Sequence, residues 1–170
     1  MNVHNHAFQP TYLPPLRAVK SAAEGERYAP MKASITIDAK SGNVSLGGLL
    51  ITTYSMTSEL SESFSIEPER PVLVLGKSIP CQFAVVQVVD GSQPVRIALR
   101  FENGVLVSCF FTFPSAAPDE ERRACSQWLT DQLGFSDSLA RFPWGSAGVA
   151  TDRSGSSHVF MHNQNNSWAR

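Results

Sequence analysis

A chain of 170 residues is long enough for one domain that buries roughly 70% of the surface exposed in its unfolded form. Its net charge is −1, from 14 Lys and Arg against 15 Asp and Glu. The chain therefore lacks the basic excess that is typical of proteins that bind nucleic acid or anionic membranes. Hydrophobic residues make up 42% of the chain and charged residues 17%, which excludes disorder by composition.

The first thirty residues differ from the remainder. Pro10, Pro14, Pro15 and Pro30 interrupt them and no hydrophobic period persists, so residues 1–30 are predicted to form a flexible arm or an upstream extension. The first clear strand begins at Met31. Met31 is therefore a second candidate for the first residue of the natural protein. Because the chain shows no signal-peptide core and no run of about 18 apolar residues, a cytoplasmic location without membrane insertion is expected.

From residue 33, apolar and polar residues alternate along the chain, as they do in half-buried strands. Ala33, Ile35 and Ile37 alternate with polar residues, AKSGN predicts a turn, and VSLGGLLITT predicts the returning strand. After a polar segment over residues 54–71, two apolar runs lie on either side of Gly76, and VRIALRF follows a further turn. These runs predict a series of antiparallel strands.

Asn103-Gly104 is the strongest local signal, because a type I′ hairpin turn needs positive φ at both central residues. A regular ladder from this turn predicts that Phe101, Leu99 and Ile97 share one face with Leu106 and Phe110. The other face would carry Arg96, Arg100 and Glu102 on the first strand and Val105, Val107, Cys109, Phe111 and Phe113 on the second. The second strand is thus apolar on both faces, which requires a cover for its second face.

Residues 118–133 predict one amphipathic helix that provides this cover. Pro118 suits a first helical position, acidic residues follow it, and Gly134 ends the helix. One apolar stripe at helical spacing is predicted to pack on the sheet: Ala124, Cys125, Trp128, Leu129 and Leu133.

The last predicted hairpin pairs residues 146–151 with residues 156–162. Asp152 and Gly155 suit a type I turn closed by a left-handed glycine. The predicted fold class is therefore α+β: a mainly antiparallel sheet or partly closed sandwich with one amphipathic helix packed on it. Residues 31–162 are predicted to form a single globular domain, and residues 163–170 a frayed polar tail.

Residues with reactive side chains form no recognisable catalytic or metal-binding motif. Cys81, Cys109 and Cys125 lie in apolar segments without CxxC spacing, which favours buried free thiols. His158 and His162 share one strand face about 13 Å apart, too far for one metal ion, and are expected to be half-exposed. The letters HNH at residues 4–6 lack the spread of a nuclease motif, and WGSAG and RSGSS miss the serine-hydrolase elbow. No cofactor or metal is predicted.

Arg141, Trp144 and Arg153 are the candidate partner-binding residues, because aromatic residues beside arginines are enriched at binding hot spots. The favoured alternative for Phe142 and Trp144 is that they close the core where the chain enters its last hairpin.

The sequence from residue 95 to 162 resembles a group of small, uncharacterised proteobacterial proteins. The resemblance is carried by FENGVLVS, a helix with WLTDQLG, then RFPWG and the hairpin DRSGSS, while HVFMH replaces a more aliphatic final strand. It implies a short cytoplasmic companion of a larger secreted or antagonistic protein, such as an immunity protein to a toxin.

Three functions follow from these observations. The first is a non-enzymatic cytoplasmic binding protein, most specifically an immunity-type protein that neutralises a protein toxin. The second is a small enzyme or ligand-binding module that uses the sheet face around Arg96, Arg100 and His158. The third is a structural or assembly subunit, with a homodimer through a sheet edge as one form. The residues favour a binding role over catalysis, with no nucleic acid and no membrane as partner.

Overall fold

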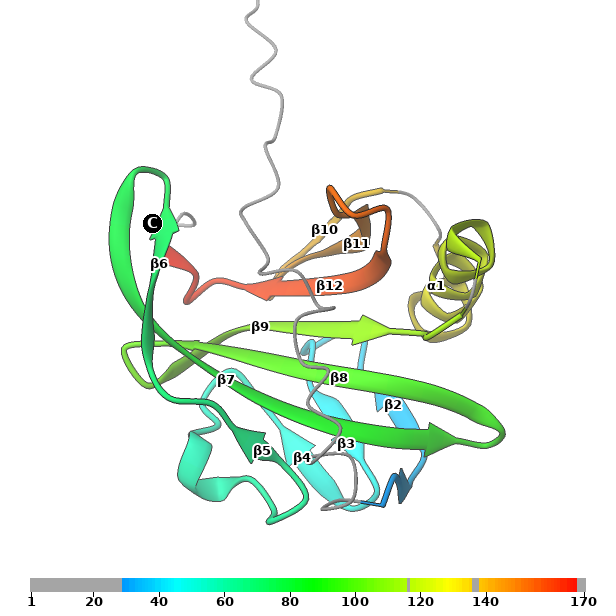
Figure 1. The fold of residues 1–170 in the computed structure, drawn as a ribbon, viewed down its shortest axis with the longest axis horizontal. Coiled ribbons are helices and arrows are strands. Elements are labelled where there is room, and N and C mark those ends of the chain that lie inside the picture. The colour runs from blue at the N-terminus through cyan, green and yellow to red at the C-terminus, as the bar shows by residue number, and fades with distance from the viewer. Residues whose placement is uncertain (1–28, 116, 136–137, 168–170) are drawn as a thin grey trace, which may run out of the picture.

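The computed structural model describes residues 29–115, 117–135 and 138–167, and confirms an α+β fold. A large sheet lies in front of a small one, and the α-helix lies at one end of both (Figure 1). The predicted arm lies outside the described residues except for its last two positions. The elements are β1 (Met31–Lys32), β2 (Ile35–Ile37), β3 (Val44–Leu46), β4 (Leu49–Ile51), η1 (Thr57–Glu59), β5 (Ser65–Ile66), β6 (Arg70–Val74), β7 (Lys77–Asp90), β8 (Gln93–Glu102), β9 (Val105–Thr112), α1 (Pro118–Leu133), β10 (Ala140–Phe142), β11 (Gly145–Thr151) and β12 (Ser157–Asn163).

The large sheet has the order β1-β7-β8-β9-β12-β11-β10, with β5 and β6 also paired to β7. Its strand pairs are antiparallel, apart from the parallel pair of β1 and β7. The small sheet is the antiparallel series β2-β3-β4. The central pairing of β9 with β12 joins strands on either side of the helix in the sequence, and this pairing assembles the candidate site described below.

The main core lies between the inner face of the large sheet and a cover made of the small sheet and α1. Trp128 of α1 packs on Phe111 and Phe113, at ring-centroid distances of 4.7 and 5.4 Å. Cys125 and Leu129 beside it are fully buried, as the apolar stripe predicts. The carboxamide of Gln132 also pairs with the backbone of β2, accepting from the Ile37 amide and donating to the Ile35 carbonyl.

The β8–β9 hairpin corrects the predicted register. Asn103 and Gly104 have the positive φ angles, 51° and 79°, that the turn requires. Beyond Phe101↔Leu106, however, the register shifts, and Arg100 faces Ser108, which leaves Val107 as an extra residue in β9. This bulge reverses the faces of the rest of β9. The predictions that Phe110 lies beside Ile97, and that Phe111 and Phe113 lie beside the arginines, are therefore wrong.

The predicted last hairpin is confirmed, with β11 paired to β12 through the turn that Asp152 begins. The Asp152 carboxylate accepts hydrogen bonds from the amides of Ser154 and Ser156 at 2.8 and 3.1 Å, and Gly155 has φ 85°. Glu121 of α1 accepts from the hydroxyl of Ser156 and the amide of Ser157, both at 3.1 Å. The small polar residues of DRSGSS are thus explained by turn geometry and attachment to the helix.

We expect Asp152→Ala to lower the free energy of unfolding by about 1 kcal/mol, because two amides in the turn lose their acceptor. Asp152→Asn keeps an oxygen acceptor and is expected to cost less. Urea denaturation followed by circular dichroism measures both. An equal loss in the two variants would contradict the role of the acceptor oxygen.

Candidate functional site

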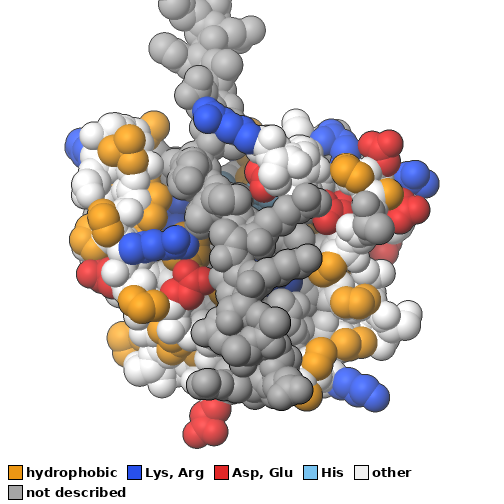
Figure 2. Space-filling view, viewed as in Figure 1, with side chains coloured by type: hydrophobic (Ala, Val, Ile, Leu, Met, Phe, Trp, Pro, Cys, Tyr) orange, Lys and Arg blue, Asp and Glu red, His pale blue; other side chains and the backbone are white. Residues whose placement is uncertain are grey.

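The candidate site is the outer face of the large sheet, which we define as the face turned away from the small sheet and α1. Arg96 and Arg100 of β8 lie on this face together with His158 of β12. These are the three residues that the sequence analysis assigned to a small enzyme or ligand-binding module. Figure 2 views the molecule from this side and shows basic and acidic side chains interspersed around it.

Strand register arranges the centre of the outer face in three rows across β8, β9 and β12. If the β9–β12 ladder is continued by one step beyond Val159↔Phe111, His158 lies opposite Thr112. The rows are Arg96–Thr112–His158, Ala98–Phe110–Phe160 and Arg100–Ser108–His162. We call the first the Arg96 row and the third the Arg100 row. Two rows of the same chemical composition, arginine, hydroxyl and histidine, thus flank an apolar row.

The Arg100 row is a continuous hydrogen-bond network. One guanidinium nitrogen of Arg100 donates to Glu102 at 3.1 Å and to the carboxamide oxygen of Asn166 at 3.0 Å. The Asn166 nitrogen donates to Ser108 at 3.1 Å, and Ser108 lies 2.8 Å from Nδ1 of His162. Arg100, Glu102, Ser108 and Asn166 are each at most 5% exposed, so the network is shielded from water.

The described part of the polar tail is not frayed, which corrects that expectation. Asn163 and Asn165 donate to the carbonyl of Leu106, and Asn166 donates to the carbonyl of Val107. A bulge leaves backbone groups without ladder partners, and buried carbonyls need donors. The asparagines of NQNN supply these donors, which is why residues 163–167 follow the sheet.

The Ser108–His162 pair, which sequence reasoning missed, has the atoms of a nucleophile and its base. The Ser108 oxygen accepts from Asn166 and shares a second hydrogen bond with His162 Nδ1, whose direction depends on the imidazole tautomer. Ser108 is buried, and its hydroxyl is already hydrogen-bonded to both Asn166 and His162. The arrangement therefore acts as a structural hydrogen bond. Only the bulged register brings these residues into line, and no local motif marks it.

We expect His162 to stay uncharged well below pH 6. Burial, then the charges of Arg100 and His158, lowers its pKa from 6.5 to about 3. Since the unfolded chain takes up this proton first, the stabilising contribution is complete above pH 6.5 and is lost as the pH falls toward 3, by up to about 1.4 kcal/mol per pH unit. Titration of the His162 ring by NMR measures the pKa. A midpoint near 6.5 would contradict this prediction.

The Arg96 row contains two buried polar atoms without partners. Among residues 29–115, 117–135 and 138–167, no group hydrogen-bonds to Nη1 of Arg96 or to Nδ1 of His158, and both atoms are shut off from solvent. His158 is 3% exposed, whereas the sequence predicted a half-exposed histidine. Burial lowers the pKa of both groups, against the opposing charges of Glu67 near Arg96 and Asp152 near His158. An unsatisfied buried polar atom costs about 1–3 kcal/mol.

The structure does not bring the three predicted partner-binding residues to this face. Trp144 is 8% exposed and donates from its indole nitrogen to the Ala39 carbonyl at 3.0 Å. Its ring stacks on Phe142 at a centroid distance of 4.8 Å, in agreement with the core-closing alternative. Arg141 on β10 and Arg153 in the β11–β12 turn are both exposed.

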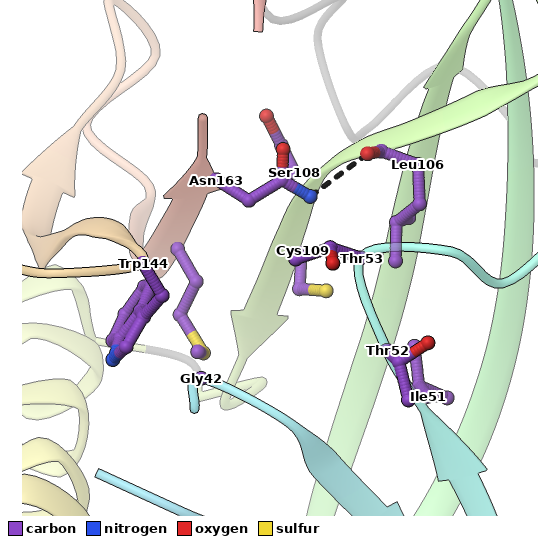
Figure 3. A pocket seen from close by; sticks show the side chains of 10 residues that line it. Gly42, Ile51, Thr52, Thr53, Leu106, Ser108, Cys109, Trp144 and Asn163 are labelled. Carbon is purple, nitrogen blue, oxygen red and sulfur yellow. Dashed lines mark hydrogen bonds between the residues drawn. The ribbon is translucent and has the colours of Figure 1, made fainter. Parts of the chain in front are cut away.

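A cavity of about 20 Å³ lies between the sheets, beside Trp144 and Met161 (Figure 3). Ile51, Thr52 and Thr53 close it from the small sheet and the following loop, and Asn163 donates to the Leu106 carbonyl at its edge. This volume holds about one water molecule and is far below that of a small-molecule pocket. The cavity is therefore a packing defect of the core.

The remaining predicted features have these outcomes. The three cysteines are buried and free, as predicted, and burial raises the pKa of the Cys109 and Cys125 thiols to about 12. The HNH letters at residues 4–6 lie outside the described residues. Within residues 29–115, 117–135 and 138–167, no cluster of three metal-ligating side chains is found and no helix is long and apolar enough to cross a membrane.

Comparison with family models, curated proteins and solved structures found no match to this chain. The resemblance of residues 95–162 to small proteobacterial proteins therefore stays a prediction.

Proposed function

We propose that this chain is a non-enzymatic binding protein that recognises its partner on the outer face of the large sheet. The observation that carries the proposal is a pair of solvent-shielded polar atoms, Arg96 Nη1 and His158 Nδ1, that have no hydrogen-bond partner in the part of the chain that the structure describes. Buried polar groups in folded proteins are almost always hydrogen-bonded, so each exception needs an explanation. A bound partner that hydrogen-bonds to both atoms removes their cost.

A binding role is favoured over catalysis by the state of the reactive groups. The hydroxyl of Ser108 is buried and held in the Arg100 row, and burial raises the pKa of the Cys109 and Cys125 thiols to about 12. Thiols need a lowered pKa to act as nucleophiles near neutral pH. The guanidinium of Arg96 is instead suited to recognise an anionic or hydrogen-bond-accepting group.

In its most specific form the proposal is an immunity-type protein that acts in the cytoplasm and neutralises a protein toxin. The resemblance of RFPWG and DRSGSS to the proteobacterial group supports this form. A partner of this kind is expected to be encoded by the adjacent gene, and the complex to dissociate when the outer face is altered.

Co-purification of the full chain with the product of the adjacent gene, followed by titration calorimetry, tests the proposal. We expect a complex that Arg96→Met weakens at least tenfold, while Arg153→Met, a matched change in the exposed turn, alters affinity less than twofold. Failure to form any complex with a neighbouring protein would contradict the toxin-neutralising form. If both variants bound the partner as tightly as the wild type does, the outer face would not be the binding surface.

A further inference from the structure

The two rows of arginine, hydroxyl and histidine differ in what they hold. In the Arg100 row the protein supplies its own occupant, the planar carboxamide of Asn166, whose oxygen accepts from Arg100 and whose nitrogen donates to Ser108. In the Arg96 row, no group in the described part of the chain hydrogen-bonds Arg96 Nη1 or His158 Nδ1. We propose that the Arg96 row is a carboxylate-binding site, filled by an Asp or Glu side chain of the partner. This inference rests on the proposed function and names the group recognised.

The Arg100 row shows what shape fits such a site. Neighbouring strands lie about 4.8 Å apart, so the arginine and histidine of a row are separated by about 10 Å at their Cα atoms. Their long side chains extend above the small hydroxyl residue between them. The Asn166 carboxamide, a planar group with two polar atoms, bonds to the arginine and the hydroxyl of its row. A carboxylate has the same planar shape.

The charges of the two rows indicate a carboxylate rather than a second carboxamide. Arg100 has its counter-charge in the row network, because Glu102 lies 3.1 Å from its guanidinium. Within the described ranges, no carboxylate lies within ion-pair distance of Arg96; the ion pairs there are Arg70–Glu67 and Arg100–Glu102. Glu67 acts on Arg96 only from beyond ion-pair distance, so burial of the guanidinium is costly, and a carboxylate bound to it would form a charge-assisted hydrogen bond.

The Arg96 row suits an acceptor-only group. A carboxylate accepts at both oxygens, so one can take the Arg96 Nη1 hydrogen and the other can accept from His158 in the tautomer that carries its proton on Nδ1. The middle row adds an apolar flank, with Phe110 packed edge-on against the His158 ring at 5.8 Å. This flank fits the methylene groups of an Asp or Glu side chain better than it fits a fully hydrated anion such as phosphate.

NMR titration of the labelled full chain tests the carboxylate assignment, with sodium acetate as the probe and sodium chloride holding ionic strength constant. Saturable shifts are expected at the His158 ring and at the Arg96 side chain. Acetamide and inorganic phosphate are expected to bind at least tenfold more weakly than acetate. Arg96→Met is expected to weaken acetate binding at least tenfold, and Arg153→Met less than twofold. If Arg96→Met fails to fold, Arg96→Lys replaces it in the test because it keeps the positive charge. Its loss of acetate affinity is expected to be smaller than that of Arg96→Met.

Absence of a saturable acetate shift, or equal binding of acetamide or phosphate, would overturn the carboxylate assignment. The co-purified partner protein separates this failure from that of the proposed function. If the partner shifts the His158 and Arg96 signals while acetate does not, the outer face binds a partner through another group. If neither acetate nor the partner shifts them, both the carboxylate assignment and the proposed function are wrong.

Discussion

Trp144→Ala is expected to lower the free energy of unfolding by about 3–5 kcal/mol, the range for deletion of a large buried aromatic side chain. The indole is 8% exposed and lies over Gly42, where a Cβ would come within 2.5 Å of the ring. Its removal leaves the Ala39 carbonyl without its donor and enlarges the cavity between the sheets. Urea denaturation followed by circular dichroism measures the loss.

Two control variants sharpen this prediction. Trp144→Phe keeps part of the ring packing and is expected to lose less stability than Trp144→Ala, while Arg153→Ala in the exposed turn should stay within about 0.5 kcal/mol of the wild type. If Trp144→Ala stayed as stable as the wild type and only lost its partner, Trp144 would be a binding residue instead of a core residue.

Arg100→Ala is expected to cost a similar amount, about 3–5 kcal/mol, because it leaves Glu102 charged and buried without its ion-pair partner. The two side chains are 4% and 5% exposed, and Asn166 loses a donor in the same change. Thermal or urea unfolding of the single variant measures the effect. We attribute this loss of stability to the unpaired carboxylate of Glu102 and not to the smaller volume of the alanine side chain.

The double variant Arg100→Met with Glu102→Leu separates these two causes. Replacing both members of a buried ion pair by apolar residues of similar size is often close to neutral, so the double variant is expected to be more stable than Arg100→Ala. Equal or greater destabilisation in the double variant would show that the ion pair itself, and not the unpaired carboxylate, determines the cost.

Features fixed by neighbouring residues were predictable from the sequence. Asn103-Gly104 and Asp152 to Gly155 form the expected turns because a few adjacent residues determine their backbone angles. The helix begins at Pro118 and ends before Gly134, as its terminal residues indicate. Alternation along β8 also placed Arg96 and Arg100 on one face.

The candidate site itself depends on distant pairings that local patterns do not specify. The bulge at Val107 reverses the faces of β9 beyond it, and neither strand of the hairpin contains a signal for it. The pairing of β9 with β12 then sets His158 and His162 in line with the two arginines. Asn166 looked like part of a polar tail because its hydrogen-bond partners exist only after the bulge has formed.

The outer face as binding surface is tested most directly by mapping NMR chemical-shift changes of the labelled chain when the product of the adjacent gene is added. Binding on the outer face predicts the largest changes on β8, β9 and β12, centred on Arg96, Thr112 and His158. Changes confined to Arg141, Arg153 and the turn beside it, with the outer face unaffected, would contradict this assignment.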